Sequence, residues 1–171
     1  MIEIIPVGNT DSATLEAMRQ ALEEVFSQKA HIDDTIALPH ESWTQRRKQH
    51  LASVLLAKLR SPSDPGDRVL GVVDVDIFAP GLNFVFGEAD IAGRKAIISL
   101  QRLRQEFYGL PKNEELFRER AVKEAVHELG HTYELKHCPN PACVMHFSNS
   151  LHDTDYKRWN FCPDCRVRLN Q

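Results

Sequence analysis

The sequence lacks the features that would place the chain in a membrane, on a secretory route or on nucleic acid. No apolar run approaches the ~20 residues that cross a bilayer. The N-terminus, Met1 to Pro6, has no positive segment and no long apolar one, so we expect no secretory signal. Positive charge is not in excess, since 21 Lys and Arg face 24 Asp and Glu, for a formal net charge of −3. Nucleic-acid binding depends on a basic surface. We therefore predict a cytoplasmic protein, a monomer, with no nucleic acid and no membrane as partner.

Cysteine is missing from the first 137 residues, and all four cysteines lie in the last fifth of the chain. They form two close pairs, Cys138 with Cys143 and Cys162 with Cys165, and 18 residues separate the inner two. This grouping is typical of a metal site in a reducing compartment. Four protein ligands would make it a closed, structural zinc site. The alternative is four free cysteines or disulfides.

The length of 171 residues and a hydrophobic content of 42% fit one globular domain, residues 1–171, with no linker and no internal repeat. Runs of β-branched and apolar residues predict strands over 2–7, 35–38, 69–78, 84–86 and 96–100. Apolar periodicity predicts helices over 13–28 and 43–60, and a central helix that begins after Asn113. Turn residues predict a loop over 61–66, and the chain after about Leu135 looks irregular. The order predicts a mixed sheet with helices on its faces.

The central helix carries the motif HExxH, His127-Glu128-Leu129-Gly130-His131. Residues four apart share a helical face, so both imidazoles can reach one ion. Glu128 is displaced by one residue and can contact a metal-bound water without being a ligand. A chance recurrence of this short pattern on a solvated helix is the alternative.

His137 strengthens the metal interpretation. On a continuous helix it would lie on roughly the opposite side from His131, so it can join the other two only if the helix stops after about Tyr133 and the chain turns back. Three histidines leave the fourth tetrahedral position for water, as in a catalytic zinc site.

These motifs resemble the archaemetzincin family of zinc metallopeptidases, which belong to the metzincin clan. The resemblance rests on HELGHTYELKHC at 127–138, Cys-Val-Met at 143–145 and CxxC at 162–165. The stretches 74–78, 83–87 and 99–104 also fit the family, so the match covers roughly residues 70–165, with a weaker fit of the N-terminal βα units. It implies a zincin-like α+β fold with a twisted mixed β-sheet, helices on its faces, a central active-site helix and an irregular, zinc-braced C-terminal segment over 136–171.

Carried over by position, the resemblance implies two zinc ions per chain, one catalytic and one structural. His146 and His152 are expected to be surface or turn residues. The implied roles are catalytic zinc ligands for His127, His131 and His137, acid/base for Glu128, Met-turn for Met145, and structural zinc ligands for Cys138, Cys143, Cys162 and Cys165.

One position departs from the family pattern, because Glu134 stands where the family usually has Gly. Gly accepts a positive φ without penalty, whereas another residue pays about 1–2 kcal/mol in the left-handed region. That cost is small against the free energy of zinc binding, so we expect the turn to survive. The alternatives are a turn with other dihedral angles, or a displaced His137 and weak metal binding. The departure therefore bears on activity more than on fold.

The sequence thus predicts a zinc-dependent hydrolase that cleaves peptide bonds in a peptide or protein substrate, with aminopeptidase action as one form. Zinc would lower the pKa of its bound water towards ~7. Glu128 would take the proton during attack and return it to the leaving amine. Phe84 to Phe86 is the candidate strand for pairing with substrate. The alternative function is a non-catalytic, zinc-stabilised peptide-binding module.

Overall fold

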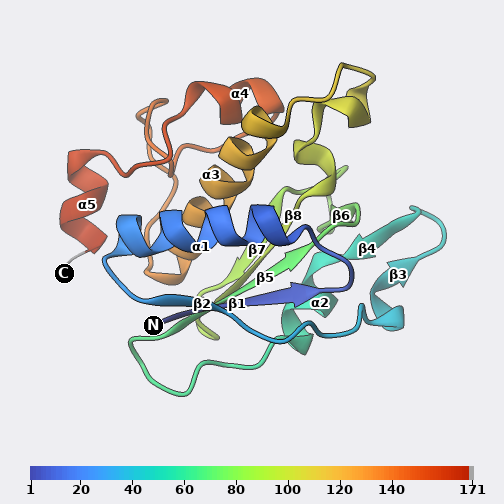
Figure 1. Cartoon of the computed structure of the whole chain (residues 1–171), viewed down its shortest axis with the longest axis horizontal. Coiled ribbons are helices and arrows are strands. Elements are labelled where there is room, and N and C mark those ends of the chain that lie inside the picture. The colour runs from blue at the N-terminus through green and yellow to red at the C-terminus, as the bar shows by residue number, and fades with distance from the viewer. Residues whose placement is uncertain (170–171) are drawn as a thin grey trace.

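The fold is organised around a twisted five-stranded sheet (Figure 1). The computed structural model describes residues 1–169. The strands follow the order β2-β1-β5-β8-β7. Their bounds are β1 Ile2–Val7, β2 Ala30–Ile32, β5 Arg68–Val73, β7 Gly87–Asp90 and β8 Lys95–Ser99. Only the β7–β8 pairing of this sheet is antiparallel, so the sheet is mixed, as predicted.

The two faces of the sheet bury two separate hydrophobic clusters. Along β5, Leu70 and Val72 join the larger cluster, whereas Val69 and Val73 join the smaller one on the other face. This alternation follows from the period of two in a strand. Because β5 lies between two parallel neighbours and is covered on both sides, its residues form a continuous apolar run.

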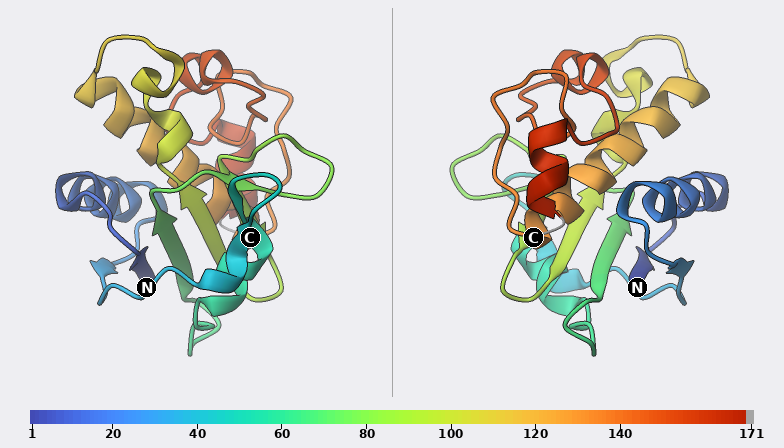
Figure 2. Two further views of the ribbon diagram at one scale, coloured as in Figure 1. Left: turned by 90° about the vertical axis from the view of Figure 1, so that its right-hand side faces the viewer. Right: turned by 90° about the vertical axis from the view of Figure 1, so that its left-hand side faces the viewer.

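Helices cover both faces. On the larger cluster lie α1, Ser12–Phe26, and α3, Glu114–Thr132, and on the smaller one lies α2, Ala52–Lys58 (Figure 2). The helix expected over 13–28 is confirmed as α1, and the Asp11 carboxylate caps it by accepting from the Thr14 N–H at 2.8 Å. α3 begins with Asn113 as its cap and Glu114 and Glu115 in its first turn, as predicted.

The helix predicted over 43–60 is wrong in its first half. Residues 43–44 and 49–51 form two strands of a small sheet, order β3-β4-β6, whose third strand comes from 77–78, and only 52–58 are helical. Lys48 takes a left-handed conformation with φ of 55°, which turns the chain and ends any helix there. Pairing with β6 then outweighs the helical pattern of the segment. The strands are β3 Trp43–Thr44, β4 Gln49–Leu51 and β6 Ile77–Phe78.

The single strand predicted over 69–78 is divided into β5 and β6, which belong to different sheets. Two further predicted strands are wrong. The segment 35–38 makes only an isolated bridge, Val7 to Ile36, and the segment 84–86 makes single backbone bonds rather than a ladder. The apolar residue at position 86 is explained by packing, since Phe86 belongs to the larger cluster although it does not lie in a strand. The terminal strand of the sheet, β7, begins one residue later.

The chain after Leu135 is mostly irregular, as predicted, with two short helices. No helix among residues 1–169 is long and apolar enough to cross a membrane. The remaining helices are α4 Leu151–Tyr156, α5 Pro163–Leu169 and the 3-10 turns η1 His40–Ser42, η2 Gln101–Leu103 and η3 Gln105–Tyr108.

Candidate metal centres

Two histidines of α3 point at the same place. His127 and His131 lie one turn apart, and their Nε2 atoms are 3.1 Å from each other. Adjacent corners of a tetrahedron around a metal with bonds of about 2.0–2.1 Å lie about 3.3–3.4 Å apart. Two facing lone pairs at 3.1 Å are therefore close to the spacing that a shared cation requires.

The end of α3 brings the third histidine back. Leu135 N–H bonds to the Gly130 carbonyl and Glu134 N–H to the His131 carbonyl, which is the hydrogen-bond pattern of a Schellman cap. Glu134 occupies the left-handed position of this cap with φ of 65°, so the turn forms in spite of the non-glycine residue. His137 then lies with its ring centroid 4.9 Å from that of His131.

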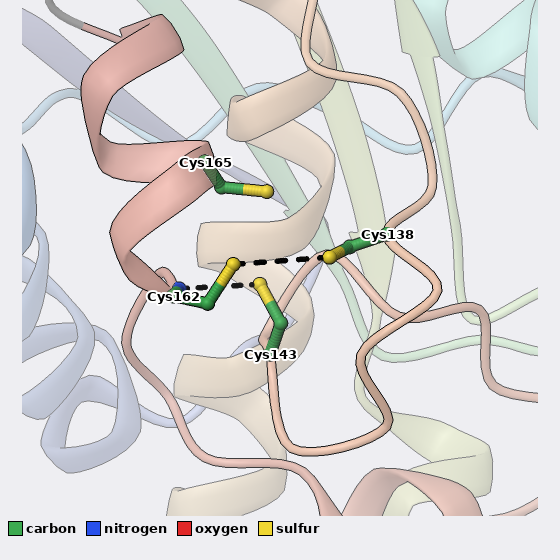
Figure 3. A group of neighbouring side chains, drawn as sticks. All are labelled: Cys138, Cys143, Cys162 and Cys165. Carbon is green, nitrogen blue, oxygen red and sulfur yellow. Dashed lines mark hydrogen bonds between the residues drawn. The ribbon is translucent and has the colours of Figure 1, made fainter.

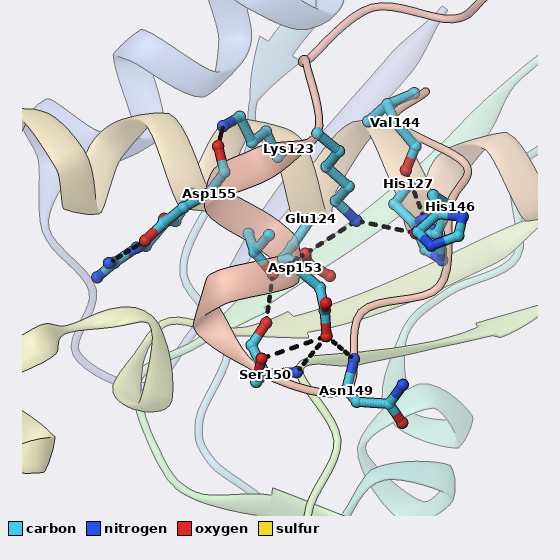
Figure 4. Close-up of polar contacts among 12 residues, drawn as sticks. Lys123, Glu124, His127, Val144, His146, Asn149, Ser150, Asp153 and Asp155 are labelled. Carbon is cyan, nitrogen blue, oxygen red and sulfur yellow. Dashed lines mark hydrogen bonds and ion pairs between the residues drawn. The ribbon is translucent and has the colours of Figure 1, made fainter. Parts of the chain in front are cut away.

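Backbone carbonyls fix which imidazole nitrogens face the cluster. His127 Nδ1 lies 2.8 Å from the Val144 carbonyl oxygen, and His131 Nδ1 lies 2.7 Å from that of Leu135 (Figure 4 shows the Val144 contact). A carbonyl only accepts, so each Nδ1 carries the proton and each Nε2 presents a lone pair. Both rings are thus in the tautomer that binds a metal through Nε2.

Burial favours the neutral forms that metal binding needs. It lowers the pKa of His127 well below the usual value, and it lowers the pKa values of His131 and His137 as well. Burial, reinforced by the neighbouring Glu124 carboxylate, raises the pKa of Glu128 to about 8. A cation held by the three histidines would lower this pKa again, which favours the carboxylate form that can accept a proton.

A methionine lies directly beneath this helix. Met145 is fully buried, and a Cβ added at Gly130 would lie 2.4 Å from its sulfur. Gly130, inside the HExxH motif, therefore leaves the space that Met145 fills. The Met145 carbonyl accepts from the Cys138 N–H at 2.9 Å, which ties the methionine segment to the residue after His137.

The four cysteines converge in a second cluster, which Figure 3 shows between the C-terminal helix α5 and two loops. Cys138 and Cys162 have their sulfurs 3.8 Å apart, and the Cys162 N–H donates to the Cys143 sulfur at 3.3 Å. With Zn–S bonds of about 2.3 Å, the edge of a tetrahedron is about 3.8 Å. Cys143 and Cys165 are buried in the larger core cluster. The four thiols thus form one group and the three histidines another. Within each group, all donor atoms lie within 4.8 Å of one another.

A polar network behind α3 was missed by sequence reasoning. Lys157 is fully buried, with its Nζ 3.2 Å from the Glu124 carboxylate, and Thr154 donates to the same oxygen at 3.2 Å. Arg120 forms a two-pronged ion pair with Asp155, at 2.6 and 2.7 Å, and Figure 4 labels Glu124 and Asp155 of this network. No spacing rule marks Lys157, because its partner lies 33 positions away on another element. The network attaches the α4 segment to the helix that carries the histidines.

A cleft of about 600 Å³ opens on the histidine cluster. One wall comes from residues 82–88, another from the segment after the methionine, and α3 forms the floor. Phe147 stands at its rim with its ring centroid 5.0 Å from that of His137. His146 lies outside the histidine cluster, with Nδ1 against the Cys138 carbonyl at 2.8 Å, and His152 lies outside it on α4. The described cleft therefore gives a ligand access to the three histidines.

A mixed sheet under an HExxH helix, with a third histidine returned by a tight turn, defines the class of zinc metallopeptidases. The model of peptidase family M54 matches residues 15–171. The archaemetzincin of Methanocaldococcus jannaschii is 45% identical over 166 residues, which cover 97% of this chain and 90% of that protein. The chain belongs to peptidase family M54, the archaemetzincins.

Solved structures agree with the fold. The crystal structure of the archaemetzincin of Methanopyrus kandleri is similar with a TM-score of 0.86 and 38% identity, covering 99% of this chain and 93% of that one. A zinc-dependent peptidase from Methanocorpusculum labreanum has a TM-score of 0.90 at 30% identity, covering 99% and 100%. The predicted zincin-like α+β fold is confirmed.

Proposed function

We propose that this chain is a zinc-dependent peptidase in which His127, His131 and His137 hold the catalytic zinc and Glu128 transfers the proton. The observation that supports it most is the pair of Nδ1–carbonyl contacts, which direct two Nε2 lone pairs to one point. The family membership supports zinc as the metal and peptides or proteins as substrates.

The residues fit the metal. Neutral imidazole nitrogens are good zinc ligands, and three of them leave an open position for water or substrate. When bound, zinc would supply a Lewis acid that activates water near neutral pH and polarises the scissile carbonyl. The protein's own contribution is to orient the rings and to place a proton acceptor beside them.

Glu128 supplies that acceptor. It follows His127 on α3 and lines the same cleft as the three histidines. In this proposal its carboxylate takes the proton from the attacking water and passes it to the leaving amine. The proton returns to the product, so the carboxylate is ready for another turnover.

The substrate is proposed to lie along β7. This strand ends the main sheet, so one of its edges has no strand partner among residues 1–169, and its first residues line the cleft. An extended peptide can add to such an edge by backbone hydrogen bonds. This strand takes the place of 84–86, which forms no ladder.

We also propose that Cys138, Cys143, Cys162 and Cys165 hold a second, structural zinc. All four ligands would come from protein, which closes the site to substrate. Cys138 follows His137 directly, so the two ions would hold neighbouring residues of one loop.

Cleavage of a peptide library, followed by mass spectrometry, tests this function. Zinc-loaded wild type is compared with Glu128→Ala and with Glu115→Ala, which removes an exposed carboxylate from the first turn of the same helix. We expect cleavage by wild type and Glu115→Ala, and a loss of about 10²–10⁴-fold in Glu128→Ala with both metals retained.

Full turnover by Glu128→Ala would refute the role of Glu128. Peptide binding without cleavage by the wild type, at two zinc ions per chain, would instead favour the zinc-stabilised binding module.

A further inference from the structure

The first residue of the edge strand β7 lies against the side chain of Glu128. Gly87 faces α3, and a Cβ built at this position would lie 2.6 Å from Glu128 Cγ and 2.9 Å from Cδ. Ordinary carbon–carbon contacts are about 3.5–4.0 Å. Any side chain at Gly87 would therefore have to push the Glu128 carboxyl away by about 1 Å.

Close packing constrains the position of this side chain. Glu128 is 7% exposed. In a densely packed interior, a side chain can shift only as far as the surrounding atoms allow. The backbone of Gly87 supplies some of those atoms.

We infer that Gly87 is a positioning residue for Glu128. Its missing side chain lets the carboxyl lie against the strand backbone, at the end of β7 that opens into the cleft. The inference rests on the proposed function, in which Glu128 moves the proton. A displacement of about 1 Å at a reacting group can reduce the rate about 10²-fold.

A second neighbour offers a competing explanation. The same Cβ would lie 2.7 Å from the carbonyl oxygen of Ile97 on β8. Gly87 could therefore be needed only for the pairing of β7 with β8, with Glu128 a bystander. Any test must separate these two contacts.

A double-mutant cycle separates them without using turnover. Thermal unfolding is measured for wild type, Gly87→Ala, Glu128→Ala and the double variant. The Ile97 contact is the same in both backgrounds, whereas the Glu128 contact disappears when Cγ is removed. We expect Gly87→Ala to lower Tm by about 2–6 °C more in the wild-type background than in Glu128→Ala. An equal decrease in both backgrounds would overturn the inference.

Gly71→Ala is the matched control for the cycle. Its Cβ would meet the side-chain ends of Ile97 and Leu59 at 2.7–3.0 Å, on the face of the sheet away from α3. It is a crowded glycine of the same sheet without Glu128 among its nearest neighbours. We expect Gly71→Ala to lower Tm by the same amount in the wild-type and Glu128→Ala backgrounds. If Gly71→Ala were coupled to Glu128 as strongly as Gly87→Ala, the inference would be overturned.

Kinetics supply the second readout. For Gly87→Ala we expect kcat to fall about ten- to hundredfold, with KM within about twofold and the zinc count unchanged. Full activity, or a loss of zinc, would overturn the inference. The thermal unfolding cycle can show coupling even if the wild type cleaves no peptide. That result would support the contact between Gly87 and Glu128, and it would mean that the proposed function is what fails. If Gly87→Ala alone does not fold, a folded double variant supports the inference and an unfolded one overturns it.

Discussion

The two donor clusters of this chain differ in access. The three histidines open to a cleft, and His137 is exposed, whereas two of the four thiols are part of the core. The histidine cluster has three donors and opens to the cleft on one side. The cysteine cluster has four donors, which would complete a tetrahedral site. Donor number and access thus separate a centre suited to chemistry from one suited to holding the fold.

The two clusters nevertheless share one stretch of chain. Between residues 137 and 145 lie the third histidine, two thiols, the carbonyl that orients His127 and the buried methionine. A change at the closed cluster should therefore reach the open one, while the reverse effect should be weak, because α3 is held by its own core packing. Substitutions at each cluster can test that asymmetry.

The largest effect is expected from Cys165→Ser. The thiol is buried, and a structural zinc contributes its binding energy to folding. We expect the free energy of unfolding to fall by at least about 3 kcal/mol, and metal to be lost from both clusters. His131→Ala is the matched variant, and we expect it to lose one ion with a smaller loss of stability. Metal counts and urea unfolding measure both. Equal losses from the two variants would abolish the distinction between the centres.

A pH-dependent effect is expected from Glu128→Gln when the histidine cluster is stripped of metal and the cysteine cluster keeps it. The carboxyl has a pKa of about 8 when folded and an ordinary value of 4.5. Between these values the folded state holds a proton that the unfolded state has lost, so this group's contribution to stability decreases as pH rises. The limit is about 1.4 kcal/mol per pH unit.

Gln does not titrate, so the stability of Glu128→Gln relative to wild type should increase from pH 5 to 8. Urea unfolding at four pH values measures it, and a pH-independent difference would contradict the burial of this carboxyl.

The smallest effect is expected from Glu134→Gly. The exposed Glu134 side chain sits on a left-handed residue, and glycine removes that strain. We expect a gain of about 1 kcal/mol, or about 2–4 °C in Tm. Ser27→Gly is the control, because Ser27 ends α1 at φ of 53°, away from the metal centres. We expect both variants to be more stable than the wild type. The zinc affinity of the histidine cluster should change only in Glu134→Gly, because Glu134 lies in the turn that places His137. A loss of stability in Glu134→Gly would show that its side chain stabilises the turn.

The sequence predicted the parts of the fold and site that depend on local pattern. α3 follows from an Asn cap, acidic first-turn residues and apolar periodicity, and the end of the helix near Tyr133 follows from the position of His137. The two pairs of cysteines are likewise marked by spacing alone. Each of these signals lies within a few residues of the feature it predicts.

The parts that were missed depend on distant partners. The small sheet at 43–51 forms because β6 pairs with it, and nothing local marks that pairing. Lys157 reads as an ordinary surface lysine until Glu124 is found beside it. Gly87 has no assigned role in the sequence, and its contact with Glu128 exists only once the sheet and α3 are packed.

The acidic edge of the main sheet has a consequence for self-association. A terminal strand with free backbone groups is a template on which a second copy can pair, and proteins avoid this with short strands and charge. β7 has four residues, Gly-Glu-Ala-Asp, with two carboxylates on the same side of the strand. Two copies brought edge to edge would oppose like charges across a short ladder. The edge proposed to pair with a peptide would thereby be protected against fibril-like stacking.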